Sequence, residues 1–176
     1  VTLVSFDLLM SLAPHWFSTI YGVYYFAGGV VAFFAVLIIA LVKLQLYGVL
    51  RREVTTEHYH DLGKQLLGYV VFWAYIAYSQ YMLIRYANIP EETVWFKVRQ
   101  GGGWGTVGWI LVIGHFAVPF LLLLPRAMKR TPILLAAVAV WLVLMHWVDM
   151  YYLVAPEAGQ PVPFGISDVL CMLGLM

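Results

Sequence analysis

The sequence predicts an all-α fold, a polytopic transmembrane four-helix bundle followed by the start of a fifth span. The chain is 63% hydrophobic and only 11% charged, whereas soluble domains are about 45–50% apolar and about 25% charged. Four apolar runs each reach the roughly 20 residues that are needed to cross a bilayer core. The net charge is only +1, and the absence of a basic stripe excludes a nucleic-acid-binding protein.

The segments follow one another in a simple order. Residues 1–17 lack a basic leader region and are too short and interrupted to span, so they are expected to lie at the periplasmic interface. The predicted spans cover residues 18–42, 66–87, 105–124 and 132–154, which together form the bundle 18–154. Residues 155–165 then form a periplasmic loop, and residues 166–176 begin a further span. Because that last run is short and residue 1 is Val, we expect a longer protein.

Helix signals agree with these boundaries. Thr131 and Pro132 give an N-cap followed by proline at the first helical position. Pro90 and the glycines at 101–103 break the chain between spans two and three. Pro119 lies inside span three and is expected to kink it, which membrane helices tolerate.

Charge placement predicts the orientation. The loops 43–64 and 126–130 carry seven basic residues, against Lys97 and Arg99 on the other side. Positively charged loops stay in the cytoplasm, so both basic loops are predicted to be cytoplasmic. An aromatic belt is expected at the outer boundary, formed by Trp16, Trp95, Trp104, Tyr151 and Tyr152.

Span four contains ionisable residues in the stretch LMHWVDMYYLV. Helical spacing places His146, Asp149 and Tyr152 on one side. Such groups at membrane depth are costly and are usually turned inward, paired or hydrated. Asp149 is predicted either to pair with Arg85 of span two or to belong to a proton route with His146, and one carboxylate can do both.

A second histidine, His115, lies near the middle of span three, at a depth that matches His146. The two rings could ligate a b-type haem, with Gly114 leaving room for the macrocycle. The alternative is that they form hydrogen bonds between helices.

Span two is unusually polar in the stretch FWAYIAYSQYMLIRY. Tyr78, Tyr81 and Arg85 lie roughly on one face. With Gln80, the two tyrosines are candidates for a quinone head-group site, and interhelical hydrogen bonding is the alternative explanation.

The first basic loop carries Glu57, His58, His60 and Asp61 before span two. Thr56 is a candidate helix cap there. Histidine titrates near neutral pH, so the cluster could collect protons for a route that uses His115 at mid-depth and, near the outer end, His146, Asp149, Tyr152 and Arg85. A metal site at His58 and His60, or a solvated loop, is the alternative, and we assign no metal. The single cysteine, Cys171, excludes cysteine-ligated clusters.

Four stretches resemble one known family. They are APHWFSTIYGVYYFAGG (13–29), TEHYHDLGK (56–64), FWAYIAYSQYMLIRYANIPEETVWF (72–96) and GHFAVPFLLLLPR (114–126). They are similar to the C-terminal half of the ActF-type membrane subunit of bacterial alternative complex III, a relative of the NrfD-like polysulfide-reductase membrane subunits. Many members have an uncharged residue where Arg85 stands.

The resemblance implies a subunit of a quinol:electron-acceptor oxidoreductase in a respiratory or photosynthetic chain, in the bacterial inner membrane. The substrate of the complex would be menaquinone or ubiquinone. This chain itself would bind no cofactor, because haem c and iron–sulfur clusters belong to partner subunits. The partners would include a paralogous NrfD-like quinol-binding subunit, an iron–sulfur subunit and c-type cytochromes.

Three functional hypotheses therefore stand. The chain contributes to proton translocation without performing redox chemistry itself, or it is a scaffold that anchors the redox subunits, or it is a b-type cytochrome. A secondary transporter is a further class, and it usually shows broken helices near the midplane, for which only Pro119 gives a hint.

Overall fold

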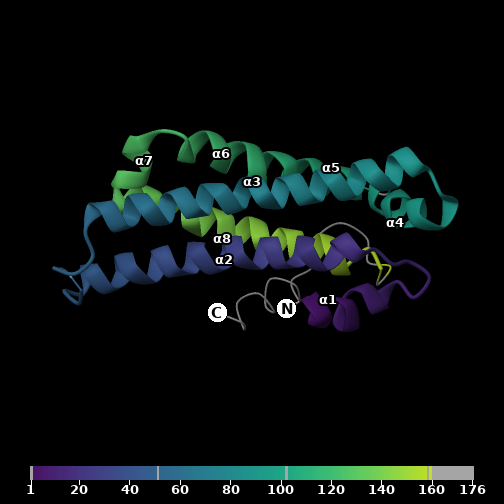
Figure 1. The fold of residues 1–176 in the computed structure, drawn as a ribbon, viewed down its shortest axis with the longest axis horizontal. Coiled ribbons are helices and arrows are strands. Elements are labelled where there is room, and N and C mark those ends of the chain that lie inside the picture. Colours follow the sequence, from purple (N-terminus) through teal and green to yellow (C-terminus); the bar gives the residue numbers. More distant parts are fainter. Residues whose placement is uncertain (1, 51, 102, 158, 160–176) are drawn as a thin grey trace.

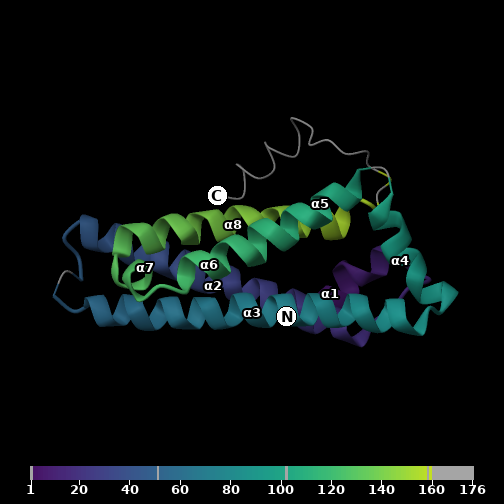
Figure 2. The ribbon, with the colours of Figure 1, turned by 90° about the horizontal axis from the view of Figure 1, so that it is seen from above.

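A computed structural model describes residues 2–50, 52–101, 103–157 and 159. The described chain is helical, and its long helices lie side by side in alternating directions, as Figures 1 and 2 show. Four helical segments are long and apolar enough to cross a membrane: 19–46, 56–87, 104–123 and 132–154. The predicted all-α, multi-pass bundle is thus confirmed for the described residues. We call the end that carries residues 43–64 and 126–130 the basic end, and the opposite end the α4 end.

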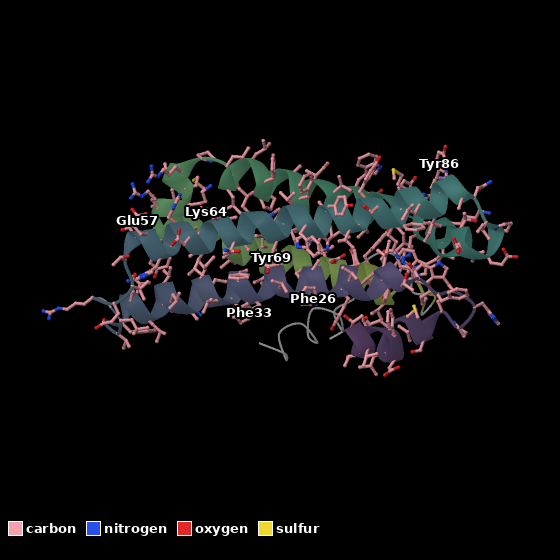
Figure 3. The ribbon with its side chains drawn as sticks, viewed as in Figure 1. Phe26, Phe33, Glu57, Lys64, Tyr69 and Tyr86 are labelled. Atoms are coloured by element: carbon pink, nitrogen blue, oxygen red, sulfur yellow. The ribbon has the colours of Figure 1, made fainter. Side chains whose placement is uncertain are left out.

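Helix α2 (Thr19–Leu46) provides the central wall of the bundle and packs against both α3 and α8. Apart from the glycines, its buried residues recur every three or four positions: Tyr21, Tyr24, Ala27, Val31, Ala35, Ile38 and Val42. This spacing places them along one stripe, the pattern of helices that pack side by side in bundles. The opposite face exposes Phe26 and Phe33, which point away from the bundle in Figure 3.

Helix α3 (Thr56–Ala87) begins ten residues before the predicted span. Thr55 caps it and not Thr56, because the Thr55 side chain and the His58 ring each bond the backbone of the other. At about 1.5 Å per residue the helix is about 48 Å long, which exceeds a core of about 30 Å. The polar first turns escaped the sequence prediction because they continue the helix without adding apolar length.

The third span is a composite of α5 (Trp104–Leu111), the π-helix η2 (Val112–Ala117) and α6 (Val118–Leu123). The irregular turns directly precede Pro119, which has no N–H to offer the carbonyl four residues earlier. That carbonyl belongs to His115. The predicted irregularity at Pro119 therefore takes the form of a widened turn around His115.

The link to span four is helical as well. Helix α7 (Arg126–Arg130) leads to Thr131, which precedes α8 (Pro132–Val154) as predicted. Lys129 is buried, and its Nζ donates to the carbonyls of Leu123 at 2.7 Å and Leu124 at 3.2 Å. A cation at the C-terminal carbonyls of a helix is favourable. One of the basic residues used to predict the orientation therefore also serves as a helix cap.

The α4 end is closed by short helices that the sequence analysis did not predict. Helix α4 (Pro90–Gln100) folds back from the end of α3, while α1 (Thr2–Leu8) and the 3₁₀ turn η1 (Met10–Leu12) precede α2. The rings of Trp16 and Trp95 stack with their centroids 4.8 Å apart. Trp16 also donates from Nε1 to the Glu92 carbonyl at 3.0 Å. Figure 2 shows α3 extending past the end of α8 to reach α4.

The expected aromatic belt is wrong for its three tryptophans. Trp16, Trp95 and Trp104 are each less than 8% exposed, so they fill the α4 end from inside. Tyr151 and Tyr152 are partly buried. Of the expected periplasmic loop and further span, residues 155–157 and 159 are described, and 160–176 lie outside the described residues.

Candidate functional site

The centre of the site is Asp149, a fully buried carboxyl group on α8. The Tyr24 hydroxyl of α2 donates to its Oδ1. The Trp73 indole of α3 donates from Nε1 to its Oδ2 at 3.2 Å. Three helices that are far apart in the sequence thus meet at one side chain. We call Tyr24, Trp73 and Asp149 the aspartate cluster.

The two donors to this carboxyl group differ in what they can do. An indole N–H can only donate, whereas a tyrosine hydroxyl can donate or accept. The direction of the Trp73 hydrogen bond is therefore fixed, while the Tyr24 hydroxyl can rotate.

Two histidines lie next to this cluster. His115 is fully buried and meets the Trp73 ring edge-on, with ring centroids 4.1 Å apart. The rings of His115 and His146 lie 6.2 Å apart. Both nitrogens of His115 and Nδ1 of His146 are buried without a partner among the described residues. Buried polar atoms are rarely left unsatisfied, and ordered water commonly supplies the missing bonds.

Gly28 makes room for these rings. A Cβ at Gly28 would lie 3.0 Å from His146 Cε1 and 3.5 Å from Trp73 Cδ1. The absence of a side chain at Gly28 therefore lets α2 approach the aromatic side chains of α3 and α8.

The residues around His115 do not fit a haem. The sequence analysis gave Gly114 the role of leaving space for the macrocycle, but Met145 fills that space, with its Sδ 2.6 Å from where a Cβ would stand. Trp141 closes the same side by donating from Nε1 to the Gly114 carbonyl at 2.8 Å. Trp73 meets the His115 ring edge-on with ring centroids 4.1 Å apart, so the b-type cytochrome hypothesis finds no support in this packing.

The expected pair between Asp149 and Arg85 is wrong. Arg85 is exposed on the part of α3 that extends past α8, whereas Asp149 is bonded to neutral groups. Spacing along α3 misled the prediction, because Trp73 and not Arg85 lies level with Asp149. Tyr152 does follow Asp149 on the inner side, and its hydroxyl approaches Gly108 of α5.

The buried arginine is instead Arg99 of α4, which the sequence analysis placed in a loop. Its guanidinium donates to the carbonyls of Tyr152 at 3.3 Å and Leu153 at 2.8 Å, at the end of α8, and to Glu157 Oε1 at 2.7 Å. It also stacks over the Trp95 ring at 3.5 Å. Burial lowers the pKa of Arg99, while the hydrogen bond and charge of Glu157 raise it, and a guanidinium stays charged in proteins. Pro90 with Glu91 and Glu92 was the helix-start signal that could have found α4.

The three quinone candidates differ in exposure and in their contacts. Tyr78 is 63% exposed, whereas Gln80 is buried with Nε2 unpartnered among the described residues. Tyr81 packs edge-on against Phe96 of α4 at 5.2 Å. The structure therefore separates these side chains instead of directing them toward one ligand.

The residues at the basic end are engaged in local contacts. Glu57 pairs with Arg130 of α7, and the His58 ring accepts the Thr55 N–H at 3.0 Å. Asp61 pairs with Lys64 at 2.8 Å, and His60 lies 3.9 Å from Asp61. No group of three metal-ligating side chains occurs among the described residues. Figure 3 places Glu57 and Lys64 at this end, opposite Tyr86.

Together, the apolar helices and the buried polar site define a multi-pass membrane protein. The chain matches no protein-family profile and no curated protein sequence.

Proposed function

We propose that this chain is a membrane subunit of a quinol:electron-acceptor oxidoreductase of the alternative complex III type, in which Asp149 takes up and releases protons. The observation that carries the proton role is the burial of Asp149 among neutral donors, with no cation beside it among the described residues. The resemblance of four stretches to the ActF-type subunit supports the choice of complex.

The proposed role rests on the contrast between Asp149 and the other buried charges. Arg99 and Lys129 have carbonyl or carboxylate partners that neutralise or cap them. Asp149 has only a hydroxyl and an indole, which stabilise a charge less than a cation does. A charged carboxylate is costly in an apolar interior. A change in the polarity or hydration around Asp149 would therefore lead it to take up or release a proton.

The proposed route continues from the aspartate cluster through His115 and His146 toward the basic end, where His60 and Asp61 flank the start of α3. The positively charged loops predict that the basic end faces the bacterial cytoplasm. Between the two regions α3 buries Leu66 and Val70, so the route requires water to cross this part of the bundle. Tyr152 lies on the α4 side of Asp149 and would serve the exit.

The test is the ratio of translocated protons to electrons, measured with the intact complex in liposomes. Asp149→Asn keeps the side-chain size but has no carboxyl group to protonate. We expect quinol oxidation to continue with a lower ratio. Asp7 of α1 provides the control, because it is an exposed carboxyl group at the α4 end. Asp7→Asn should leave the ratio of protons to electrons unchanged.

An unchanged ratio with Asp149→Asn in a fully assembled complex would contradict the proton role. The aspartate cluster would then serve only to join α2, α3 and α8, and the chain would be a scaffold for the redox subunits. The observation that favours a scaffold is the set of interhelical bonds themselves, because Tyr24, Trp73 and Asp149 link three helices.

A further inference from the structure

The basic end contains a cavity that the proposed proton route does not use. It has a volume of about 470 Å³ and lies between the end of α2, the loop that follows it, and the first residues of α3 and α8. A chain of hydrogen bonds forms its inner wall. Tyr59 donates its hydroxyl to Gln45 Oε1 at 2.8 Å, and Gln45 donates from Nε2 to the Val54 carbonyl at 2.6 Å. Tyr59 is 1% exposed, so its side chain belongs to the packed interior behind the cavity.

One side of the cavity is polar and positively charged. It is lined by Arg52 and by the threonines Thr55 and Thr56. Arg52 is exposed and forms no ion pair with any residue that the structure describes. Arginine is well suited to bind phosphate oxygens through its planar array of N–H donors, and threonine hydroxyls can add hydrogen bonds.

The other side of the cavity is apolar. Val42 and Leu46 of α2 and Ile133 of α8 line it, and Leu46 and Ile133 are 75% and 70% exposed. Both residues belong to helices that are apolar enough to span a membrane, at the end where these helices reach the basic loops. These apolar lining residues therefore belong to the spanning helices, while Arg52 belongs to the loop beyond them. A lipid has the same order, with acyl chains inside the membrane and the head group at its surface.

We infer that this cavity binds the phosphate of an anionic phospholipid from the leaflet at the basic end. Arg52, Thr55 and Thr56 hold the head group, while Val42, Leu46 and Ile133 contact the first carbons of the acyl chains. A free phosphate ion would share the polar contacts but would leave the apolar side without a partner.

A neighbouring hollow has a different charge. It has a volume of about 400 Å³ and is lined by Glu53, Asp61 and His58 as well as by leucines. The exposed Glu53 carboxylate would repel a phosphate there. Of these two cavities, the first combines an apolar wall with an arginine that has no ion pair among the described residues.

Native mass spectrometry of the full-length protein in detergent tests the inference, with phosphatidylglycerol and phosphatidylcholine as the probes. The wild type should bind phosphatidylglycerol more tightly than phosphatidylcholine. Arg52→Gln should weaken phosphatidylglycerol binding about fivefold, the factor expected for one basic side chain at an anionic head group. Lys43→Gln removes an exposed charge at the same end that does not line the cavity, and it should change binding less than twofold.

Further measurements separate a lipid from other sources of the effect. Leu46→Asn, which leaves Arg52 in place, should also weaken phosphatidylglycerol binding, and millimolar inorganic phosphate should not displace the lipid. The inference fails if Arg52→Gln and Lys43→Gln weaken binding equally, because the effect would then be the general positive field. It also fails if the two lipids bind equally or if inorganic phosphate displaces phosphatidylglycerol, which would indicate a site for the free ion.

Discussion

At the residue scale, Asp149 is costly to bury, and its two hydrogen bonds offset part of that cost. Each bond comes from a different helix, so each also fixes the position of one helix relative to α8. The two donors differ in what they can do next. Trp73 can only donate, while Tyr24 can rotate, so the cluster has one rigid and one adjustable contact.

Tyr24→Phe removes the adjustable contact and leaves Oδ1 of Asp149 without its donor. We expect a loss of about 0.6–3 kcal/mol in the free energy of unfolding, the combined range for a lost interhelical bond in membranes and for an unsatisfied buried acceptor. The free energy of unfolding can be measured in mixed micelles with an increasing fraction of dodecyl sulfate. Tyr25→Phe is the matched control, because Tyr25 is the adjacent tyrosine and does not bond Asp149. Equal losses in both variants would show that the Tyr24 bond has no particular value.

The sequence was informative about which residues are buried and less informative about their partners. Asp149, His146 and His115 were predicted to face inward because ionisable groups rarely face lipid. The partner of Asp149 could not be predicted, because the choice between Arg85 and Trp73 depends on how far α3 extends past α8. That offset is set by α4 and by the polar start of α3, and neither contributes to an apolar run.

At the element scale, the approach of α2 to α8 depends on Gly28. Gly28→Ala would place a methyl group 3.0 Å from His146 Cε1 and 3.2 Å from its Nδ1, so the His146 ring must move by a few tenths of an ångström within a packed interior. We expect a loss of about 1–3 kcal/mol in unfolding free energy, the usual cost of overpacking. Gly29→Ala is the control, since a Cβ there has no atom within 4 Å and alanine favours the helix. A tolerated Gly28→Ala would show that α2 and α8 are not closely fixed at this point.

The junction of α4 with α8 depends on Arg99. Arg99→Met leaves Glu157 without its cation and the Leu153 carbonyl without its donor, so we expect a loss of about 3 kcal/mol or more in unfolding free energy. Adding Glu157→Gln should recover part of this loss, because the unpaired charge is then gone. The control is Lys97→Met, an exposed cation of the same helix, which should change stability by less than about 0.5 kcal/mol. No recovery in the double variant would mean that the carbonyl contacts and not the ion pair hold α4.

At the scale of the whole molecule, the two ends differ in construction. The α4 end is closed by short helices, stacked tryptophans and a buried arginine, while the basic end carries exposed charges and an open cavity. The four spans could be predicted from apolar length, since the bilayer imposes that length directly. The short helices at both ends could not, because they are polar or mixed in composition and their position depends on contacts with distant segments.

The same asymmetry predicts which end faces the cytoplasm. Lys129 and Arg99 are buried in helix-capping contacts, so they should not count toward the charge rule. Without them the basic end still has six Lys and Arg residues, against Arg85 and Lys97 at the α4 end. Two single-cysteine variants can show which side of the membrane each end faces. Glu53→Cys marks the basic end and Glu91→Cys marks the α4 end, each in a chain with Cys171→Ser. A membrane-impermeant maleimide should label the cysteine at 91 in intact spheroplasts, and the cysteine at 53 only after permeabilisation. The reverse labelling pattern would place the basic end outside the cell and would overturn the proposed direction of proton flow.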